Sequence, residues 1–431
     1  MSIKTKLVKF ARAIFPKSLL RTIESAYRIF RVGIVSAMYG FPARSLRVIA
    51  VTGTNGKTTT ANFLNEILKQ AGYTTALFST ATIEVNGKQR RNDMNVTVAT
   101  TVQMQRFFKE AKRAQADFVV LEITSHALDQ YKLALVPIDT AIMTNLTQDH
   151  LDYHKTMKAY ASAKARLFKR RPRHIILNSD DAWFDYFNQF SAKGSKVTYG
   201  ESPDANIQLQ HIKETAKSTS ATALIDNDKT INLRINIPGK VNIYNAAAAA
   251  AAAHLIGVEP ATISKGVANL KGVPGRFEYV IHKPYNVVVD YAHTPDAIEK
   301  LLISAKAMTK GKVTIVFGSC GDRDKGKRPI MGELAAKLAD TIVLTDEENY
   351  TENADVIRRM IYEGIKKAKG QKKTTEIADR REAIAFALNN AKKDDMILIT
   401  GLGHEVYRVI DGVRIPWNDA DVVREILAQE N

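Results

Sequence analysis

The sequence predicts an α/β protein with two sheet-containing units: a central P-loop unit with a parallel sheet, and a C-terminal Rossmann-like unit. Three observations lead to this prediction. Apolar strand-like runs alternate with helical patterns from Arg47 onward, a glycine-rich loop follows the first run, and a second series of runs begins after "LKGVPGRFEYV". We therefore expect residues 1–45 to form a basic amphipathic segment, 46–275 the central domain and 276–431 the C-terminal domain.

The central unit is expected to begin with the strand "RVIAVTG" and a helix through Ala71. Further strands are expected at "TTALFST", "DFVVLEI", "DTAIMTNLT" and "HIILNSDD". Residues 205–237 alternate polar and apolar side chains as antiparallel strands do, and "NIYNAAAAAAAAHLIG" has a strong helix propensity. The C-terminal unit is expected to have strands at "YNVVVDYA", "KVTIVFGS", "DTIVLTD" and "DMILITG". Parallel strands joined by helices place the loops that follow them at one edge of each sheet.

Composition limits the class of protein. With 431 residues, 45% of them hydrophobic, the chain can bury large cores in two or three domains. A single cysteine, Cys320, excludes an intrachain disulfide and fits a reducing cytoplasm. No apolar run reaches the roughly 18 residues that a membrane-spanning helix needs, and the N-terminus lacks the clean apolar core of a signal peptide.

The positive charge is concentrated at the N-terminus. Of the formal net charge of +17, residues 1–48 contribute +9, from ten Lys and Arg side chains against one acid. The remainder has neither an aromatic-studded basic platform nor zinc-knuckle spacing, so we do not expect nucleic-acid binding.

The N-terminal segment has a helical pattern with basic residues around its apolar positions, which are Leu7, Phe10, Ala11, Ile14 and Phe15. Two interpretations stay open: a helix docked on the protein's own surface, or a helix lying on an anionic membrane. The second predicts a peripheral contact through residues 1–40 at the inner face of the membrane.

The loop in "RVIAVTGTNGKTTT" has the features of a phosphate site. Backbone N–H groups at a helix start attract anionic phosphate, Lys57 adds a positive charge, and Thr58 offers a hydroxyl to Mg²⁺. Its spacing, Gly53-x-x-Gly56-Lys57-Thr58, is shorter than the common G-x-x-x-x-G-K-[ST] pattern. The match is therefore partial, and a chance turn is the alternative.

Polar side chains follow the next two strands. Glu122 lies in "LEITSHALDQ" and His150 in "TNLTQDHLDYH". A carboxylate and an imidazole at neighbouring strand ends suit a divalent metal beside a phosphate, and helix capping is the alternative. Lys164, in the helical "YASAKARLF", is by itself expected to be a solvated charge.

The C-terminal unit also carries polar strand ends. Asp290, in "VVDYAHTPDAI", could accept from ribose hydroxyls, and Arg276, in "VPGRFE", could bridge phosphates. The loops "FGSCGDRDKGKRPIM" and "TGLGHEVYR" follow other strands. Together they predict a rim that faces a ligand.

These motifs, in this order, resemble those of the Mur ligases, and most of all the MurE-type UDP-N-acetylmuramoyl-tripeptide synthetases. The resemblance extends from Arg47 to the C-terminus and is carried by "TGTNGKTTT", "EITSHAL", "NLTQDHLDYH", "YASAKARLF", "IPGKVNIYNAAAA", "VPGRFE", "DYAHTPDA", "GSCGDRDKGKRP", "DRREAI" and "GLGHE".

The resemblance implies an ATP-dependent amide ligase of peptidoglycan precursor synthesis. ATP would phosphorylate the carboxylate of a muramoyl peptide, and the amine of an amino acid would attack the acyl phosphate. Two alternatives stay open: a ligase like folylpolyglutamate synthetase, and a non-catalytic, membrane-docked nucleotide-binding partner.

The resemblance also implies roles for single residues. The ATP site would contain Gly53, Thr54, Asn55, Gly56, Lys57, Thr58, Thr59, Asn245, Arg276, Asp290 and His293. Catalytic roles are implied for Lys57, Glu122, His150 and Lys164, and Mg²⁺ would be held by Thr58, Glu122, His150 and Lys164, the last matching the family's carbamylated lysine. The substrate side would contain Thr97, Ser125, His126, Arg323, Glu347, Tyr350, Gly401 and Glu405, with Arg323 on the amino acid's carboxylate.

The chain departs from the family's pattern on the substrate side. The N-terminal UDP-binding domain is replaced by the short basic segment, "GKGHE" reads "GLGHE", and the T-T-P segment reads "TVA" at Thr97–Ala99. Where diaminopimelate-adding members have D-N-P-R, this chain has "EENY" from Glu347 to Tyr350. Two glutamates without the arginine suit a diamino acid with a cationic end, such as lysine or ornithine, and exposed loop charge is the alternative.

Overall fold

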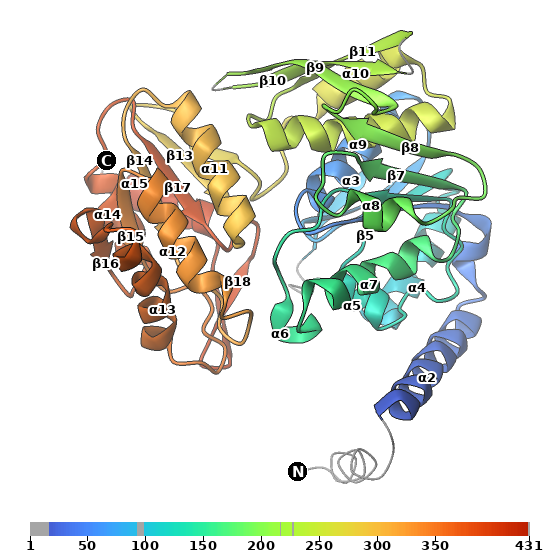
Figure 1. Cartoon of the computed structure of the whole chain (residues 1–431), viewed down its shortest axis with the longest axis horizontal. Helices are drawn as coiled ribbons and strands as arrows, with labels where there is room; N and C mark the ends of the chain where they lie inside the picture. The colour runs from blue at the N-terminus through green and yellow to red at the C-terminus, as the bar shows by residue number, and fades with distance from the viewer. Residues whose placement is uncertain (1–16, 93–98, 216, 226–227, 430–431) are drawn as a thin grey trace.

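The computed structural model describes residues 17–92, 99–215, 217–225 and 228–429. Within these ranges the chain forms two large sheets, one of eleven strands and one of six, that lie side by side with their helices around them (Figure 1), and a third sheet of two strands. No helix in the described ranges is long and apolar enough to cross a membrane. Thr97 and the apolar residues predicted for a helix at 7–15 lie outside the described residues.

The larger sheet has the strand order β11-β10-β9-β8-β7-β6-β1-β5-β2-β3-β4. Its strands are β1 Arg47–Thr52, β2 Thr75–Phe78, β3 Thr82–Val85, β4 Lys88–Arg91, β5 Phe118–Glu122, β6 Thr140–Met143, β7 His174–Asn178, β8 Lys196–Gly200, β9 Ile207–Glu214, β10 Thr219–Ile225 and β11 Lys229–Ile235. The six neighbouring strands β8, β7, β6, β1, β5 and β2 pair in parallel. Strands β9, β10 and β11 pair antiparallel with one another. The predicted parallel sheet and the antiparallel pattern over 205–237 are both confirmed.

Helices cover both faces of this sheet. They are α2 Lys17–Met38, α3 Lys57–Gln70, α4 Thr101–Arg113, α5 Ser125–Asp129, α6 Leu151–His154, α7 Met157–Phe168, α8 Phe184–Asn188, α9 Lys240–Ile256 and α10 Pro260–Asn269. In β1, Ile49 and Val51 pack in a core with α3, α9 and α10, whereas Val48 and Ala50 face a core with α4 and α7. Because successive side chains of a strand point to opposite faces, an unbroken apolar run is what a strand buried on both faces requires.

The alanine run forms α9, as predicted, and its residues 246–253 are completely buried. Small side chains let α9 pack closely against α3. Helix α10 packs on the same neighbour through Gly266, where an added Cβ would lie 2.5 Å from the Cα of Ile67. The backbones of α3 and α10 therefore come too close for any side chain between them.

The smaller sheet has the order β12-β13-β17-β14-β15-β16. Its strands are β12 Glu278–Ile281, β13 Asn286–Asp290, β14 Val313–Phe317, β15 Thr341–Leu344, β16 Thr374–Glu376 and β17 Met396–Thr400. All pairs are parallel except that of β12 with β13. The helices are α11 Pro295–Met308, α12 Lys327–Leu338, α13 Ala354–Lys367, α14 Arg380–Asn389 and α15 Asp419–Gln429, and β18 Tyr407–Ile410 pairs with β19 Val413–Pro416. This is the parallel α/β sheet expected for the C-terminal unit.

The close approach of α3 and α10 gives a stability test. We expect Gly266→Ala to lower the free energy of unfolding by about 1–3 kcal/mol, because the backbone at Ile67 must shift to admit the methyl group. Helix propensity alone would make alanine more stable than glycine in a helix interior, so the expected change in the free energy of unfolding has the opposite sign. Urea unfolding measures the difference.

Gly272→Ala is the matched control, because an added Cβ there has no neighbour within 4 Å. Equal stabilities of the two variants would show that α10 and α3 are not packed this closely.

Candidate functional site

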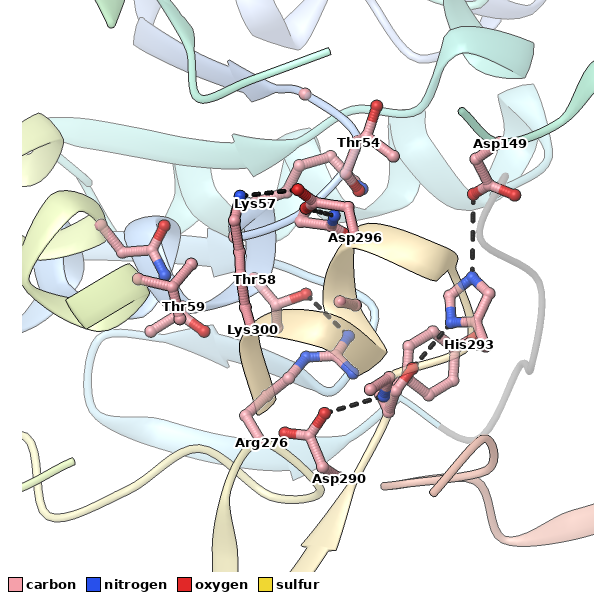
Figure 2. A pocket seen from close by; sticks show the side chains of 18 of the residues that line it. Thr54, Lys57, Thr58, Thr59, Asp149, Arg276, Asp290, His293, Asp296 and Lys300 are labelled. Atoms are coloured by element: carbon pink, nitrogen blue, oxygen red, sulfur yellow. Dashed lines mark hydrogen bonds and ion pairs between the residues drawn. The ribbon is translucent and has the colours of Figure 1, made fainter. Parts of the chain in front are cut away.

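A pocket lies between the two units, at the ends of β1 and β13 (Figure 2). The central unit lines it with the loop after β1 and with Glu122 and Lys164, and the C-terminal unit with Arg276, Asp290 and His293. Every residue expected in the ATP or metal site lines this one pocket. Residues that lie far apart in the sequence are therefore brought together as the resemblance implied.

The loop between β1 and α3 depends on its two glycines. Gly56 has φ 82°, and an added Cβ would overlap the Asn245 side chain; at Gly53 it would overlap the hydroxyl of Thr144. Gly56 provides no side-chain cap to α3, so the N–H groups of the first turn are left for another acceptor. A helix start of this kind favours a phosphate group.

Lys57 folds back over this loop. Its Nζ donates to the carbonyl oxygen of Thr54 at 2.7 Å, and burial lowers the pKa of the Lys57 amine. A phosphate in the loop would offer this amine a charged partner in place of a neutral carbonyl.

Oxygen atoms gather beside Lys57. Oε2 of Glu122 accepts from the hydroxyl of Thr58 at 2.9 Å and from the backbone N–H and hydroxyl of Thr80 at 2.8 and 3.0 Å. Nη2 of Arg276 donates to the same Thr58 hydroxyl at 3.2 Å from across the pocket (Figure 2). Hydroxyl and carboxylate oxygens are the ligands Mg²⁺ prefers, together with phosphate oxygens and water.

Lys164 lies directly beneath the loop. Only 1% of the residue is exposed, and its Nζ donates to the carbonyl oxygen of Gly53 at 2.6 Å. The expectation that this lysine is a solvated charge is therefore wrong, because α7 points it into the protein. Burial and then the charge of Lys57 lower the pKa of the Lys164 amine well below its usual value.

In the same pocket as Lys164, Asp149 contacts side chains of both units. Its carboxylate lies 3.2 Å from Nε2 of His150, 3.7 Å from Nε2 of His293 and 3.6 Å from Nζ of Lys327. Burial favours the neutral acid, but His150, Lys327 and His293 hold the pKa of Asp149 well below its usual range. Burial also lowers the pKa of His150 to about 3, which keeps the imidazole neutral, as a metal ligand must be.

The residues expected at the nucleotide are fixed by backbone and amide contacts. The Asp290 carboxylate accepts from the N–H groups of Phe277 and Ala292, each at 2.7 Å, and burial raises its pKa. Nδ2 of Asn245 donates to Oδ1 of Asn242 at 3.3 Å. These contacts hold both side chains at the rim of the pocket.

The residues expected at the substrate are more widely spread. Ser125 lines the pocket and lies 2.9 Å from Nε2 of His154, whereas His126 packs against His150 with ring centroids 4.7 Å apart. Arg323 and Glu405, from the C-terminal unit, do not line the pocket.

Around Arg323, the C-terminal unit forms a second polar cluster. The Arg323 guanidinium lies 5.2 Å from the ring centre of Tyr350, whose hydroxyl is 3.3 Å from Oε2 of Glu348. Glu347 is 4% exposed, and its carboxylate fills the space above Gly401 that any side chain there would need. The alternative that these glutamates are exposed loop charges is therefore wrong.

Three contributors to the site were not predicted in any role. Lys327 is buried and lies 3.6 Å from the Asp149 carboxylate. Asp296 is half-buried and accepts from Nδ2 of Asn55 at 2.7 Å. The Tyr160 hydroxyl lies 3.2 Å from the Thr54 hydroxyl. The charged loop "GDRDKGKR" was the one available indication for Lys327. Among the described side chains, no three His, Cys, Asp or Glu residues are grouped so that they could hold a metal ion by themselves.

Comparison with known proteins identifies the family. Residues 51–253 match the Mur ligase middle domain, and residues 275–403 match the domain described as "Mur ligase, glutamate ligase domain". The chain is 39% identical over 404 residues to the UDP-N-acetylmuramoyl-L-alanyl-D-glutamate–2,6-diaminopimelate ligase of Bacillus velezensis, covering 92% of this chain and 81% of the relative. It is also 39% identical over 390 residues to the Aquifex aeolicus ligase of the same name, covering 90% and 79%.

Solved structures agree. A structure titled as a UDP-N-acetylmuramoyl-L-alanyl-D-glutamate–2,6-diaminopimelate ligase aligns with a TM-score of 0.62 at 33% identity, over 90% of this chain and 79% of that one. Folylpolyglutamate synthase of Mycobacterium tuberculosis aligns with a TM-score of 0.71 over 86% and 92%, but at 17% identity, which shows a common fold only. The chain belongs to the Mur ligase family and is an ATP-dependent amino-acid ligase.

Proposed function

We propose that this ligase adds a diamino acid to the carboxylate of a muramoyl peptide, in peptidoglycan precursor synthesis. The observation that carries the proposal is the pocket in which the phosphate loop of one unit faces Arg276, Asp290 and His293 of the other. The diaminopimelate ligases that are 39% identical to this chain support the two substrates.

In the proposed first step, the acceptor carboxylate attacks the γ-phosphorus of ATP, and the bond to the bridging oxygen breaks to release ADP. The N–H groups at the start of α3 and the amine of Lys57 would hold the phosphates, and Arg276 would reach them from the other unit. Positive groups fixed around a transferring phosphoryl group are the main source of catalysis in such reactions.

The residues present fit Mg²⁺. Thr58 and Glu122 would bind one ion through the oxygens that now share a hydrogen bond, and His150 would bind a second through its neutral ring. When bound, Mg²⁺ supplies charge neutralisation at the phosphate oxygens.

Lys164 fits the proposed carbamate. A buried amine with a strongly lowered pKa keeps its lone pair, which can attack carbon dioxide to give a carbamate and release one proton. The carbamate oxygens would then face the same pocket beside Lys57 and serve the second Mg²⁺.

In the second step, the amine attacks the acyl carbon, the C–N bond forms, phosphate leaves, and the nitrogen loses a proton. We place the carboxylate of the incoming amino acid at Arg323, between Tyr350 and His126, where the charge of Arg323 already acts on both rings. Gly401 and Glu405 lie in the loop that follows β17.

The far end of the amino acid would meet Glu347 and Glu348. Within the described part of the chain, Oε1 of Glu347 has no hydrogen-bond partner, and burial raises the pKa of Glu347 to about 7. An ammonium group would supply the missing donor and favour the ionised acid. We therefore propose a cationic far end, as in lysine or ornithine.

We also propose a peripheral contact of the N-terminal segment with an anionic membrane. Exposed apolar residues on α2 support this contact.

Phosphate release tests the reaction. Purified protein with ATP, Mg²⁺ and UDP-muramoyl-dipeptide, with and without its nucleotide, should release phosphate only when lysine, ornithine or diaminopimelate is added. We expect lysine or ornithine to exceed diaminopimelate, because the latter brings a carboxylate to the two glutamates. Absence of amino-acid-dependent release with either acceptor would refute the proposal, and release with a folate acceptor and glutamate would favour the alternative ligase class.

Lys164→Ala tests the carbamate. We expect kcat to fall about 10²–10³-fold, as when a single fixed electrostatic group is removed from an active site. Lys158→Ala, on the exposed side of the same helix, is the matched control. Native mass spectrometry in bicarbonate buffer should show the added carbon dioxide on the wild type and the control only, and its presence on Lys164→Ala would contradict the assignment.

The raised pKa of Glu347 predicts a pH effect on folding. Between its ordinary pKa of 4.5 and about 7, the unfolded chain ionises this group while the folded chain keeps the proton, so stability falls as the pH rises through that window. Glu347→Gln removes this loss, and its stability relative to wild type should rise by roughly 3 kcal/mol from pH 4.5 to 8. Urea unfolding at both pH values measures it, with Glu363→Gln, on an exposed position of α13, as control. Equal pH slopes for the two variants would show that Glu347 ionises normally.

A further inference from the structure

Helix α2 carries an apolar row that lies away from the described body of the protein. Ile23, Tyr27, Phe30, Ile34 and Met38 recur at three- and four-residue spacing and are 48–76% exposed. Spacing of this kind places all five on one face of the helix. Nearly half of the exposed large hydrophobic side chains in the described residues lie on this one helix.

The opposite face of α2 fixes the helix to the central unit. Val32 and Ser36 are buried, and Nη1 of Arg28 donates to the carbonyl oxygen of Asp129 at 3.4 Å. Figure 1 shows α2 extending outward from the central unit, on the side away from the C-terminal unit. The apolar row is therefore held outward by a packed helix.

A row of positive charges lies next to the apolar row. Arg106, Lys109 and Arg113 are exposed at helical spacing on α4, which packs against α2. Nε of Arg106 donates to the Tyr39 hydroxyl at 3.1 Å, and Nζ of Lys109 lies 5.8 Å from the centre of the same ring. Tyr39 follows the last residue of α2, so the positive row begins where the apolar row ends.

The sequence adds charge of the same sign. Arg31 and Arg44 are exposed near these rows, and Lys4, Lys6, Lys9 and Arg12 precede the described part of the chain. The acid on α4, Glu110, is paired with Arg90 at 2.9 Å. The surface formed by α2 and α4 is thus apolar in one part and positive in the other.

We propose that α2 and the outer face of α4 form a docking surface for an anionic lipid bilayer. The apolar row would enter the boundary between headgroups and acyl chains, and the α4 row would lie against the negative headgroups. A second copy of the chain suits this surface less well, because a twofold contact through α2 would bring two positive α4 rows together. This inference deepens the membrane contact proposed above and does not depend on the ligase substrates.

Co-sedimentation with vesicles tests the surface without ATP, acceptor or amino acid, so its outcome is separate from that of the ligase assay. Wild-type protein should bind vesicles containing phosphatidylglycerol and bind pure phosphatidylcholine vesicles far more weakly. Phe30→Ser with Ile34→Ser should abolish binding to both.

The charges are tested separately. Arg106→Gln, Lys109→Gln and Arg113→Gln together should weaken binding to anionic vesicles about 100-fold, since each basic residue near such a surface contributes roughly fivefold. Lys366→Gln, Lys369→Gln and Lys372→Gln remove the same charge from exposed positions of the C-terminal unit and should leave binding within about twofold. Thermal melts establish that all variants fold.

Three outcomes would overturn the proposal. Equal loss in both triple variants would mean that overall charge attracts the protein, and equal binding to the two kinds of vesicle would remove the role of anionic lipid. A wild-type dimer that becomes monomeric in the Phe30→Ser, Ile34→Ser variant, without vesicle binding by the wild type, would show that a second copy covers α2.

Discussion

The loop between β1 and α3 is the constraint on which the rest of the site depends. Its backbone passes so close to Thr144 and Asn245 that Gly53 and Gly56 cannot carry side chains. Oδ1 of Asn145 accepts from the Asn55 N–H at 2.9 Å, and the Thr144 hydroxyl donates to the Asn55 carbonyl oxygen at 2.7 Å. The segment that directly follows β6 thus fixes the shape of the loop before any nucleotide binds, so the N–H groups of α3 need not be ordered at the moment of binding.

The two units meet over this loop through polar contacts. Arg276 reaches Thr58, Asp296 accepts from Asn55, and Asp149 lies among His150, His293 and Lys327. These groups can exchange one polar partner for another as phosphates enter, which a packed apolar contact could not do. The apolar core that extends from α3 and α9 to β13 and β14 lies behind them, so the units stay joined while the polar contacts change.

Much of the fold could be predicted because it is encoded locally. The run Val48–Val51 is apolar at every position, which a strand buried on both faces requires, and the glycines of the loop mark where the backbone turns. Lys164 and Lys327 could not be predicted from the residues alone, because the groups that surround them lie more than a hundred positions away in the sequence. Glu347 differs again: its charge was recognised, but its burial depends on how closely Gly401 approaches it.

Two neighbouring lysines, the buried Lys164 and the half-buried Lys57, explain why the proposed carbamate suits this pocket. Lys57 and Lys164 both contact carbonyl oxygens of the same loop, and two ammonium groups there would repel each other in a region of low dielectric. Burial lowers the pKa of both amines, and at Lys164, where the pKa falls well below its usual value, the charge of Lys57 lowers it further. Addition of carbon dioxide to Lys164 would then replace a like-charged neighbour by an anion, so that Lys57 gains a counter-charge and the second Mg²⁺ gains oxygen ligands. The same reaction would thus remove the repulsion between the two amines and supply the negative charge that Lys57 needs.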